Sequence, residues 1–300
     1  MIRRHCLPAR HGGFTLVELI VVMVLVGVIA GMLVLQVRPA MQAYLAIRQR
    51  ANLTSQADAA LRRIVTEVRT AVPNSLRYTH DANNECIEFV PTTDGGRYRL
   101  DADYAKPANA FGTPVTGGTS TTQFGVLTTL ATSAGQRVAR AGDYVVIGNV
   151  NRDDVYAGLA TGTGGAAVGR IKTITDSTQA ADQAVAQHLI ALAQAATFPA
   201  GYEGGRFVVV PQNERAVTYT CDVRAGAVWR VTGYTPTAAP QTTCPTGVAR
   251  LVAHVSDCGF VYRENEGATQ QSGYLQLRLG LTEGDETARL TLGAHVENAP

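Results

Sequence analysis

The stretch Gly12-Gly13-Phe14-Thr15-Leu16-Val17-Glu18 decides the fold, because it joins a short basic leader to a long apolar run. Residues 14–35 are 22 consecutive positions with one ionisable side chain, Glu18. A helix of that length reaches roughly 33 Å at about 1.5 Å per residue, enough to cross a hydrocarbon core of about 30 Å. We therefore expect a transmembrane helix over residues 14–38. Glu18 is a candidate functional residue, since an unpaired carboxylate in a membrane span is costly.

The glycine pair lies before the apolar run, which argues against a conventional secretory signal peptide. Such a peptide has its small-residue cleavage site after the apolar segment. Here the chain continues past residue 35 as Gln36-Val37-Arg38-Pro39, without a site of that kind. A plain signal anchor with Glu18 at the membrane interface is one alternative, but it would leave the carboxylate without a role.

The residues Gly13-Phe14-Thr15-Leu16-Val17-Glu18-Leu19 resemble the cleavage and methylation signature of type IV prepilins and type II secretion pseudopilins. The resemblance implies that a prepilin peptidase cuts after Gly13 and that Phe14 becomes an N-methylated amino terminus. It also implies that Glu18 pairs with the terminal amine of a neighbouring subunit in a filament. Such a pairing would supply the partner that a buried carboxylate needs.

The charges around the apolar run indicate the orientation of the chain in the membrane. The leader, residues 1–13, carries Arg3, Arg4 and Arg10 and no acidic residue, so it should stay in the cytoplasm while the rest of the chain faces the periplasm. Removing it leaves 23 of the 26 basic residues against 24 acidic ones, a formal net charge of −1. A nearly neutral chain without a basic stripe does not indicate a nucleic-acid partner. We expect a single-pass inner-membrane protein whose partners are prepilin peptidase and other pilins or pseudopilins, and which later moves into a pilus or pseudopilus.

Residues 39–75 continue the helix as an amphipathic extension. Apolar residues recur there at spacings of three and four, which predicts one buried face: Leu53, Ala57, Ala60, Leu61, Ile64, Val65 and Val68. Pro73 should end the helix, so residues 14–72 are expected to form one long helix. At Pro39 a kink and a helix break remain alternatives.

Residues 76–300 are expected to form one β-rich head domain, which gives an α+β, pilin-like fold. Short β-branched or aromatic runs alternate with turn residues, most regularly over Tyr274–Leu279. Asp101–Gly142 is poor in core residues and is expected to form a long loop or an irregular lobe. Together with Gly158–Gly169 it would offer loops suited to display. The run His188–Leu192 fits a helix or a strand.

Cysteine usage fits an oxidising compartment. Cys6 leaves with the leader, and four cysteines remain, which allow three disulfide connectivities. The favoured one is Cys221–Cys244, which closes a proline-rich excursion, together with Cys86–Cys258. No spacing fits a metal unit, and Asn151, Asp153 and Asp154 fit a solvated loop better than a calcium site. No catalytic constellation is present, so we expect neither a cofactor nor an enzyme.

The 287 residues that follow the leader are more than a major pilin usually has, which favours a minor subunit. The head resembles the MshO-type minor pilins of mannose-sensitive haemagglutinin (MSHA) pili in four short stretches: Cys86–Leu100, Val217–Asp222, Val255–Tyr262 and His295–Pro300. The resemblance implies a minor pilin for assembly or initiation of the pilus. The alternatives are a GspJ- or PilW-like minor pseudopilin of type II secretion and a tip adhesin.

Overall fold

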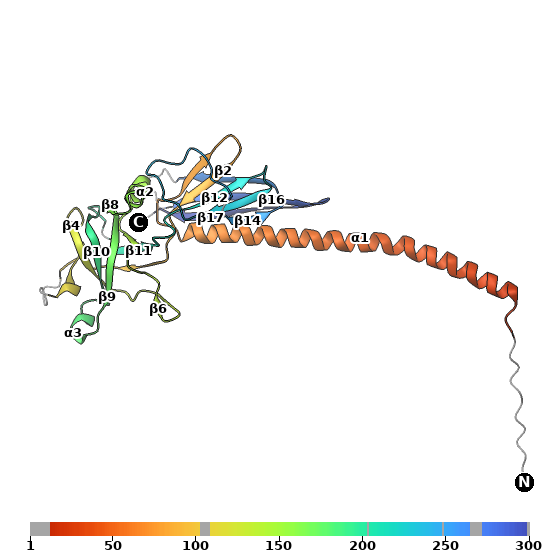
Figure 1. Ribbon diagram of the computed structural model, residues 1–300, viewed down its shortest axis with the longest axis horizontal. Helices are drawn as coiled ribbons and strands as arrows, with labels where there is room; N and C mark the ends of the chain where they lie inside the picture. Colours follow the sequence, from red (N-terminus) through yellow and green to blue (C-terminus); the bar gives the residue numbers. More distant parts are fainter. Residues whose placement is uncertain (1–12, 103–108, 203, 248, 265–271, 299–300) are drawn as a thin grey trace, which may run out of the picture. The chain divides into compact units, whose positions relative to one another are not determined.

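A computed structural model describes residues 13–102, 109–202, 204–247, 249–264 and 272–298. It confirms the expected fold class, a long N-terminal helix followed by a β-rich head (Figure 1). The chain divides into two compact units, Met1–Asn52 and Leu53–Pro300, which are described separately. The leader apart from Gly13, and with it Cys6, lies outside the described residues.

The helix α1 spans Leu16–Arg69, 54 residues, and contains Pro39 in its interior. The helix does not break at the proline. Its end comes slightly before Pro73, because the Val72 N–H already donates to the Val90 carbonyl at 2.9 Å. The part of α1 from Leu53 onward buries the predicted face, with Val65 only partly buried: Leu53, Ala57, Ala60, Leu61, Ile64 and Val68.

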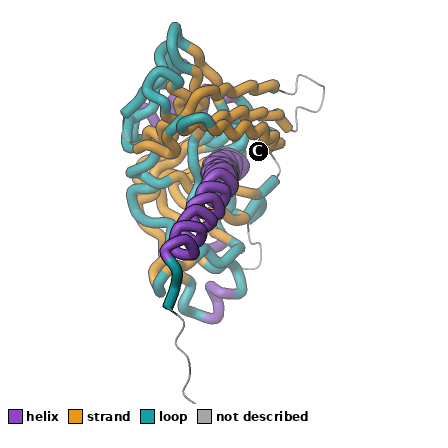
Figure 2. Tube along the Cα trace, turned by 90° about the vertical axis from the view of Figure 1, so that its right-hand side faces the viewer, coloured by secondary structure: helices purple, strands orange, loops and turns teal. Residues whose placement is uncertain are grey.

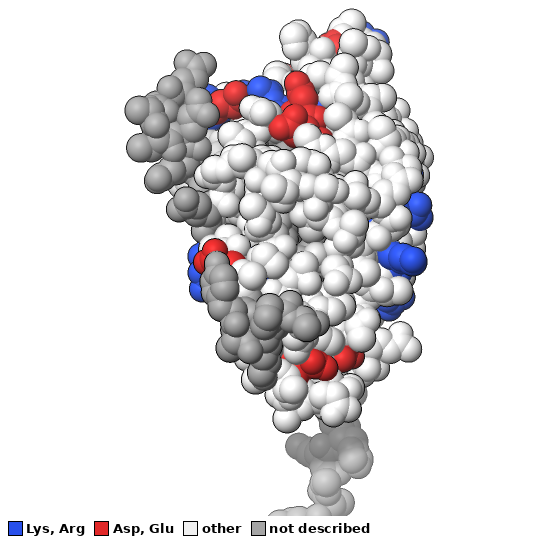
Figure 3. Space-filling view, turned by 90° about the vertical axis from the view of Figure 1, so that its left-hand side faces the viewer, with Lys and Arg blue, Asp and Glu red and all other residues white. Residues whose placement is uncertain are grey.

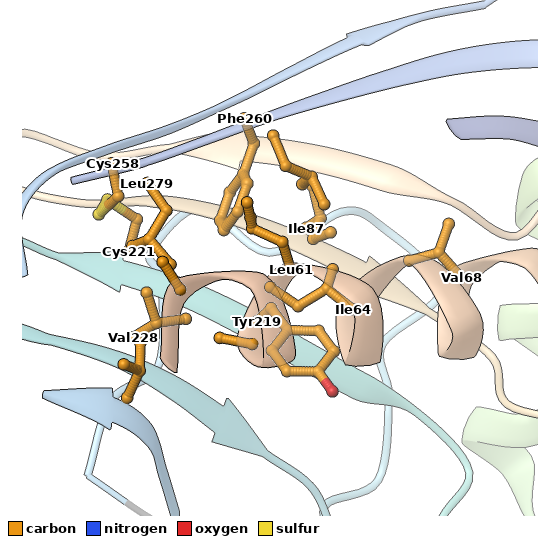
Figure 4. Close-up of a cluster of buried hydrophobic side chains, with 14 of the residues drawn as sticks. Leu61, Ile64, Val68, Ile87, Tyr219, Cys221, Val228, Cys258, Phe260 and Leu279 are labelled. Carbon is orange, nitrogen blue, oxygen red and sulfur yellow. A yellow bond between two sulfur atoms is a disulfide. The ribbon is translucent and has the colours of Figure 1, made fainter. Parts of the chain in front are cut away.

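Two antiparallel sheets form the main core of the head together with this part of α1 (Figure 4). The first has the order β1-β2-β12-β13-β14, and the second the order β15-β16-β17. Their strands are β1 (Arg77–His80), β2 (Glu85–Phe89), β12 (Val217–Asp222), β13 (Ala227–Val231), β14 (Ala249–Ala253), β15 (Val255–Arg263), β16 (Ser272–Glu283) and β17 (Glu286–Glu297). The alternating run at Tyr274–Leu279 lies in β16, where leucines fill the core and the residues between them are exposed.

Residues 90–216 form a lobe inserted between two neighbouring strands of the first sheet. β2 and β12 pair directly, with Phe89 opposite Val217, so the two ends of the insertion lie side by side. A larger sheet with the order β3-β11-β7-β9-β10-β4 makes up the lobe. The elements of the whole lobe, in chain order, are β3 (Asp94–Arg97), η1 (Ala110–Gly112), β4 (Ser120–Val126), β5 (Thr132–Ser133), β6 (Gln136–Arg137), β7 (Tyr144–Val146), α2 (Arg152–Thr161), β8 (Gly164–Gly165), β9 (Val168–Asp176), α3 (Ala180–Gln183), β10 (His188–Thr197) and β11 (Arg206–Val210). β5 and β6 pair with each other, apart from the larger sheet.

The sheet of the inserted lobe closes on itself. Tyr98, just after β3, bridges to Val126 of β4, the strand at the opposite end of the order. Hydrogen bonds from Leu127 N to Arg97 O at 2.8 Å and from Arg99 N to Gly125 O at 3.1 Å extend the bridge. The interior is filled by side chains, including the edge-to-face pairs of Phe124 with Tyr98 and with Phe207. Closure removes two sheet edges that would otherwise expose unpaired backbone groups.

The structure places Asp101–Gly142 in this lobe, which was one of its two alternatives, and corrects the loop expected at Gly158–Gly169. Asp101–Gly142 contains β4, β5, β6 and η1, although residues 103–108 lie outside the described ranges, and Gly158–Gly169 contains the end of α2, β8 and the start of β9. His188–Leu192 belongs to strand β10, and Figure 2 shows that the head consists mostly of strands and loops. β4 has backbone partners on both sides, β10 on one and the residues around Tyr98 on the other.

The disulfides join Cys86 to Cys244 and Cys221 to Cys258, so the favoured connectivity was wrong. Cys86 lies directly opposite Thr220 in the β2–β12 ladder. Successive side chains point to opposite faces of a sheet, so Cys86 and Cys221 point to opposite sides. Cys221 faces α1 and meets Cys258 of β15 in the core (Figure 4). Cys86 points to the other side of the sheet, where it is bonded to Cys244.

Candidate processing and assembly site

The residues at the start of α1 form the candidate site. The Glu18 N–H donates to Thr15 Oγ1 at 3.3 Å, and the Leu19 N–H donates to the Thr15 carbonyl at 3.2 Å. Thr15 therefore caps the helix, and Glu18 lies in its first turn, where a negative charge is favourable. The sequence analysis missed this role of Thr15, although Thr15-Leu16-Val17-Glu18 has the spacing of a capping box.

Gly13 and Phe14 precede the helix and are open to an approaching enzyme. A Cβ added at Gly13 would meet no atom within 4 Å, and Phe14 is 81% exposed. Gly13, Phe14 and Glu18 thus lie together within six consecutive residues. No ion pair of the Glu18 carboxylate is found among the described residues. The arrangement presents an accessible peptide bond next to a capped helix whose carboxylate is available to a partner.

The helix that follows carries apolar side chains on all sides. From Leu16 to Leu35 its large hydrophobic residues are about half exposed or more in the isolated chain. By length and composition α1 is able to cross a membrane, and it is the one such helix in the described part of the chain. So much apolar surface requires lipid or other apolar helices around it, since exposing it to water is unfavourable.

A second group of polar residues lies buried in the head, around Arg77. Arg77 is 1% exposed, stacks on the Tyr156 ring and donates to Asp153 at 2.8 Å and to the carbonyls of Thr237 and Ala238. Glu88 accepts from Tyr234 at 2.7 Å and from Gln241 at 2.9 Å. Burial raises the pKa of the Glu88 carboxyl, opposed by the Tyr234 hydrogen bond and the Arg77 charge.

This buried group joins several segments of the head to one another, and within the described residues its Arg77 Nε has no hydrogen-bond partner. Its members come from β1, β2, α2 and residues 234–241, and they largely satisfy one another. The predicted solvated loop at residues 151–154 is in fact the start of α2, and its Asp153 pairs with Arg77. In the described residues no group of three or more His, Cys, Asp or Glu side chains is placed to hold a metal ion.

His188 forms a carboxylate pair that resembles catalytic machinery, but both of its nitrogens are engaged. Nδ1 lies 2.7 Å from Asp176 Oδ1, and Nε2 accepts from the Leu130 N–H at 3.0 Å. A general base needs an unoccupied nitrogen within reach of the substrate proton. This histidine therefore serves to fasten residues 127–131 to β10.

The comparison with known families bears on the N-terminal site. Residues 8–34 match the model of the prokaryotic N-terminal methylation motif. Neither a curated protein nor a solved structure matches the chain. The motif match supports a type IV prepilin-like protein, a membrane-anchored structural class that is in general processed by prepilin peptidase and assembled with other pilins.

Proposed function

We propose that the chain is a minor subunit of a type IV filament, of the MSHA pilus kind, that takes part in filament assembly or initiation. The observation that carries the proposal is the methylation-motif match across an accessible Gly13–Phe14 bond, directly before an apolar helix that contains Glu18. An ordinary anchor would use neither the cleavage junction nor the carboxylate.

The proposed mechanism follows from the chemistry of the N-terminus. Prepilin peptidase removes residues 1–13 on the cytoplasmic side and Phe14 is N-methylated. The head lies in the periplasm while residues 14–38 hold the subunit in the inner membrane. On extraction from the bilayer, the apolar sides of α1 pack against other helices, and Glu18 selects the register by pairing with the terminal amine of a neighbour.

The inserted lobe favours display as a second role, that of a tip adhesin. Its outer face carries few charged side chains (Figure 3), and it is built between two adjacent strands without interrupting their pairing. The MSHA subtype rests on the short resemblances in the core strands. A GspJ-like pseudopilin of type II secretion remains the alternative for the same fold. The two occupied nitrogens of His188 and the mutual contacts of Arg77, Glu88 and Tyr234 support a non-enzymatic subunit.

Mass spectrometry of the native amino terminus tests the proposal. We expect a chain that begins at methylated Phe14 in cells with prepilin peptidase and an uncut chain in cells without it. Gly13→Val should abolish the cut, and because a Cβ at Gly13 touches nothing, this loss reports on recognition by the peptidase. Gly27→Ala, at an open glycine inside α1, is the matched control and should be processed normally. An uncut native chain would contradict the proposal.

A further inference from the structure

The last strand of the five-stranded sheet leaves one of its edges open. β14 pairs with β13 along one side. On its other side, no backbone hydrogen bond to residues 249–253 is found within the described ranges. Unpaired N–H and C=O groups along such an edge can bind another chain.

A groove runs between this edge and α1. It has a volume of about 400 Å³ and is lined by Gln56, Ala59, Ala60 and Arg63 of α1 and by Arg250, Leu251, Val252 and Ala253 of β14. The small alanines leave room beside the edge, and the lining carries two cations and no carboxylate. Arg63 is held by Glu67 at 3.1 Å, whereas the exposed Arg250 has no ion-pair partner in the described part of the chain.

The same head carries a hairpin of opposite charge. β16 and β17 meet in the turn Glu283-Gly284-Asp285-Glu286, which places three carboxylates within four residues. Glu283 and Glu286 lie directly opposite each other, with Asp285 between them in the turn. β15 pairs with β16 as far as Leu281, and the Thr282 N–H donates to the His254 carbonyl at 2.8 Å, so the turn lies at the end of the sheet (Figure 1). Its negative charge is complementary to the two arginines of the groove.

We infer that these two surfaces bind each other between copies of the chain: the acidic β16–β17 turn of one copy enters the basic groove between α1 and β14 of the next. The two surfaces are different, so the contact is head-to-tail and can repeat. It does not require copies to point in opposite directions, which suits chains anchored in one membrane. The contact lies entirely in the head and goes beyond the proposed function, since it needs neither cleavage nor a filament.

Energy transfer between donor- and acceptor-labelled full-length chains in lipid vesicles tests the contact. Arg250→Glu and Asp285→Lys should each weaken association by about tenfold, as expected for reversing a charge at an interface. Arg140→Glu, at an exposed arginine of the inserted lobe, is the matched control and should leave association unchanged. Raising the salt from about 50 mM to about 500 mM should weaken the wild-type contact.

A mixture of the two variants distinguishes the possible partners. If the contact joins two copies, mixing Arg250→Glu chains with Asp285→Lys chains should restore association, because the unaltered turn of the first then meets the unaltered groove of the second, and the reversed groove meets the reversed turn. If the groove and the turn pair within one chain, wild-type chains do not associate through these surfaces. If the groove serves another protein, wild-type chains do not associate through their heads. Either of these two results would overturn the inference, whether or not the N-terminus is processed.

Discussion

At the start of α1, one threonine and one glutamate have separate tasks within four residues. Thr15 accepts a backbone N–H of the first turn, so the helix begins at Leu16 with a cap. The cap does not use the side chain of Glu18. The carboxylate therefore remains available to another molecule. Because the helix N-terminus carries a partial positive charge, the position tolerates Glu18 even before a partner arrives.

Glu18→Gln should leave membrane insertion and N-terminal processing intact but reduce incorporation into filaments by about thirtyfold. The estimate takes about 2 kcal/mol for the loss of one hydrogen bond between charged groups. Quantitative blotting of sheared filaments measures it. Thr15→Ala is the control from the same turn. It removes the cap at a cost of about 1 kcal/mol to the helix start and should reduce incorporation far less. Equal incorporation of Glu18→Gln and wild type would remove Glu18 from the mechanism.

At the scale of elements, two carboxylates on neighbouring strands of the head respond to pH in opposite directions. Burial raises the pKa of Glu88 on β2. The pKa of Asp81, just after β1, is lowered, chiefly because the carboxylate accepts the backbone N–H groups of Cys244 and Asn83. A raised folded-state pKa favours folding below the ordinary value, about 4.5 for Glu88, and this contribution is lost as the pH rises through the folded pKa. A lowered pKa favours folding above its ordinary value, about 3.8 for Asp81, and is lost as the pH falls.

We therefore expect Glu88→Gln and Asp81→Asn to change the pH profile of unfolding in opposite ways. Denaturant unfolding of the full chain in detergent measures both. The stability of wild type relative to Glu88→Gln should fall as the pH rises above about 4.5, while its stability relative to Asp81→Asn should fall as the pH drops below about 4. Parallel profiles for the two variants would show that neither environment acts on its carboxylate as described.

At the scale of the whole molecule, the two disulfides constrain very different lengths of chain. Cys86–Cys244 spans 158 residues and encloses the entire inserted lobe, whereas Cys221–Cys258 spans 37. In the chain-entropy description, a longer closed loop restricts the unfolded chain more. The Cys86–Cys244 disulfide also fastens residues 234–244, which contact Arg77 and Glu88. The Cys244 N–H, which donates to Asp81, holds the same segment.

Replacing both cysteines of a pair by alanine should lower the free energy of unfolding by about 5 kcal/mol for Cys86–Cys244 and about 4 kcal/mol for Cys221–Cys258. Denaturant unfolding of the two double variants checks the order. Each variant is the control for the other, because both remove one disulfide from the same head. A larger loss for Cys221–Cys258 would mean that packing in the core, not loop length, sets the contribution.

Local patterns were enough to predict the N-terminal helix and the face that it buries. The unbroken apolar run and the spacing of Leu53 to Val68 are patterns within a few turns of one helix. The Thr15 cap was equally readable from its spacing to Glu18. The strand β4 within Asp101–Gly142 was missed because its partner β10 lies more than sixty residues further along the chain, so its pairing leaves no local pattern.

The sequence by itself determined that this protein has an apolar helix with a methylation motif at its start, an amphipathic continuation and a β-rich head with four cysteines. Only the tertiary structure decided how those cysteines pair, that residues 90–216 form a closed lobe between β2 and β12, and that Arg77 lies buried among Asp153, Tyr156 and Glu88. The helix follows from contacts within a few residues. Strand register and the side to which a cysteine points depend on pairing across more than a hundred residues, which no local pattern records.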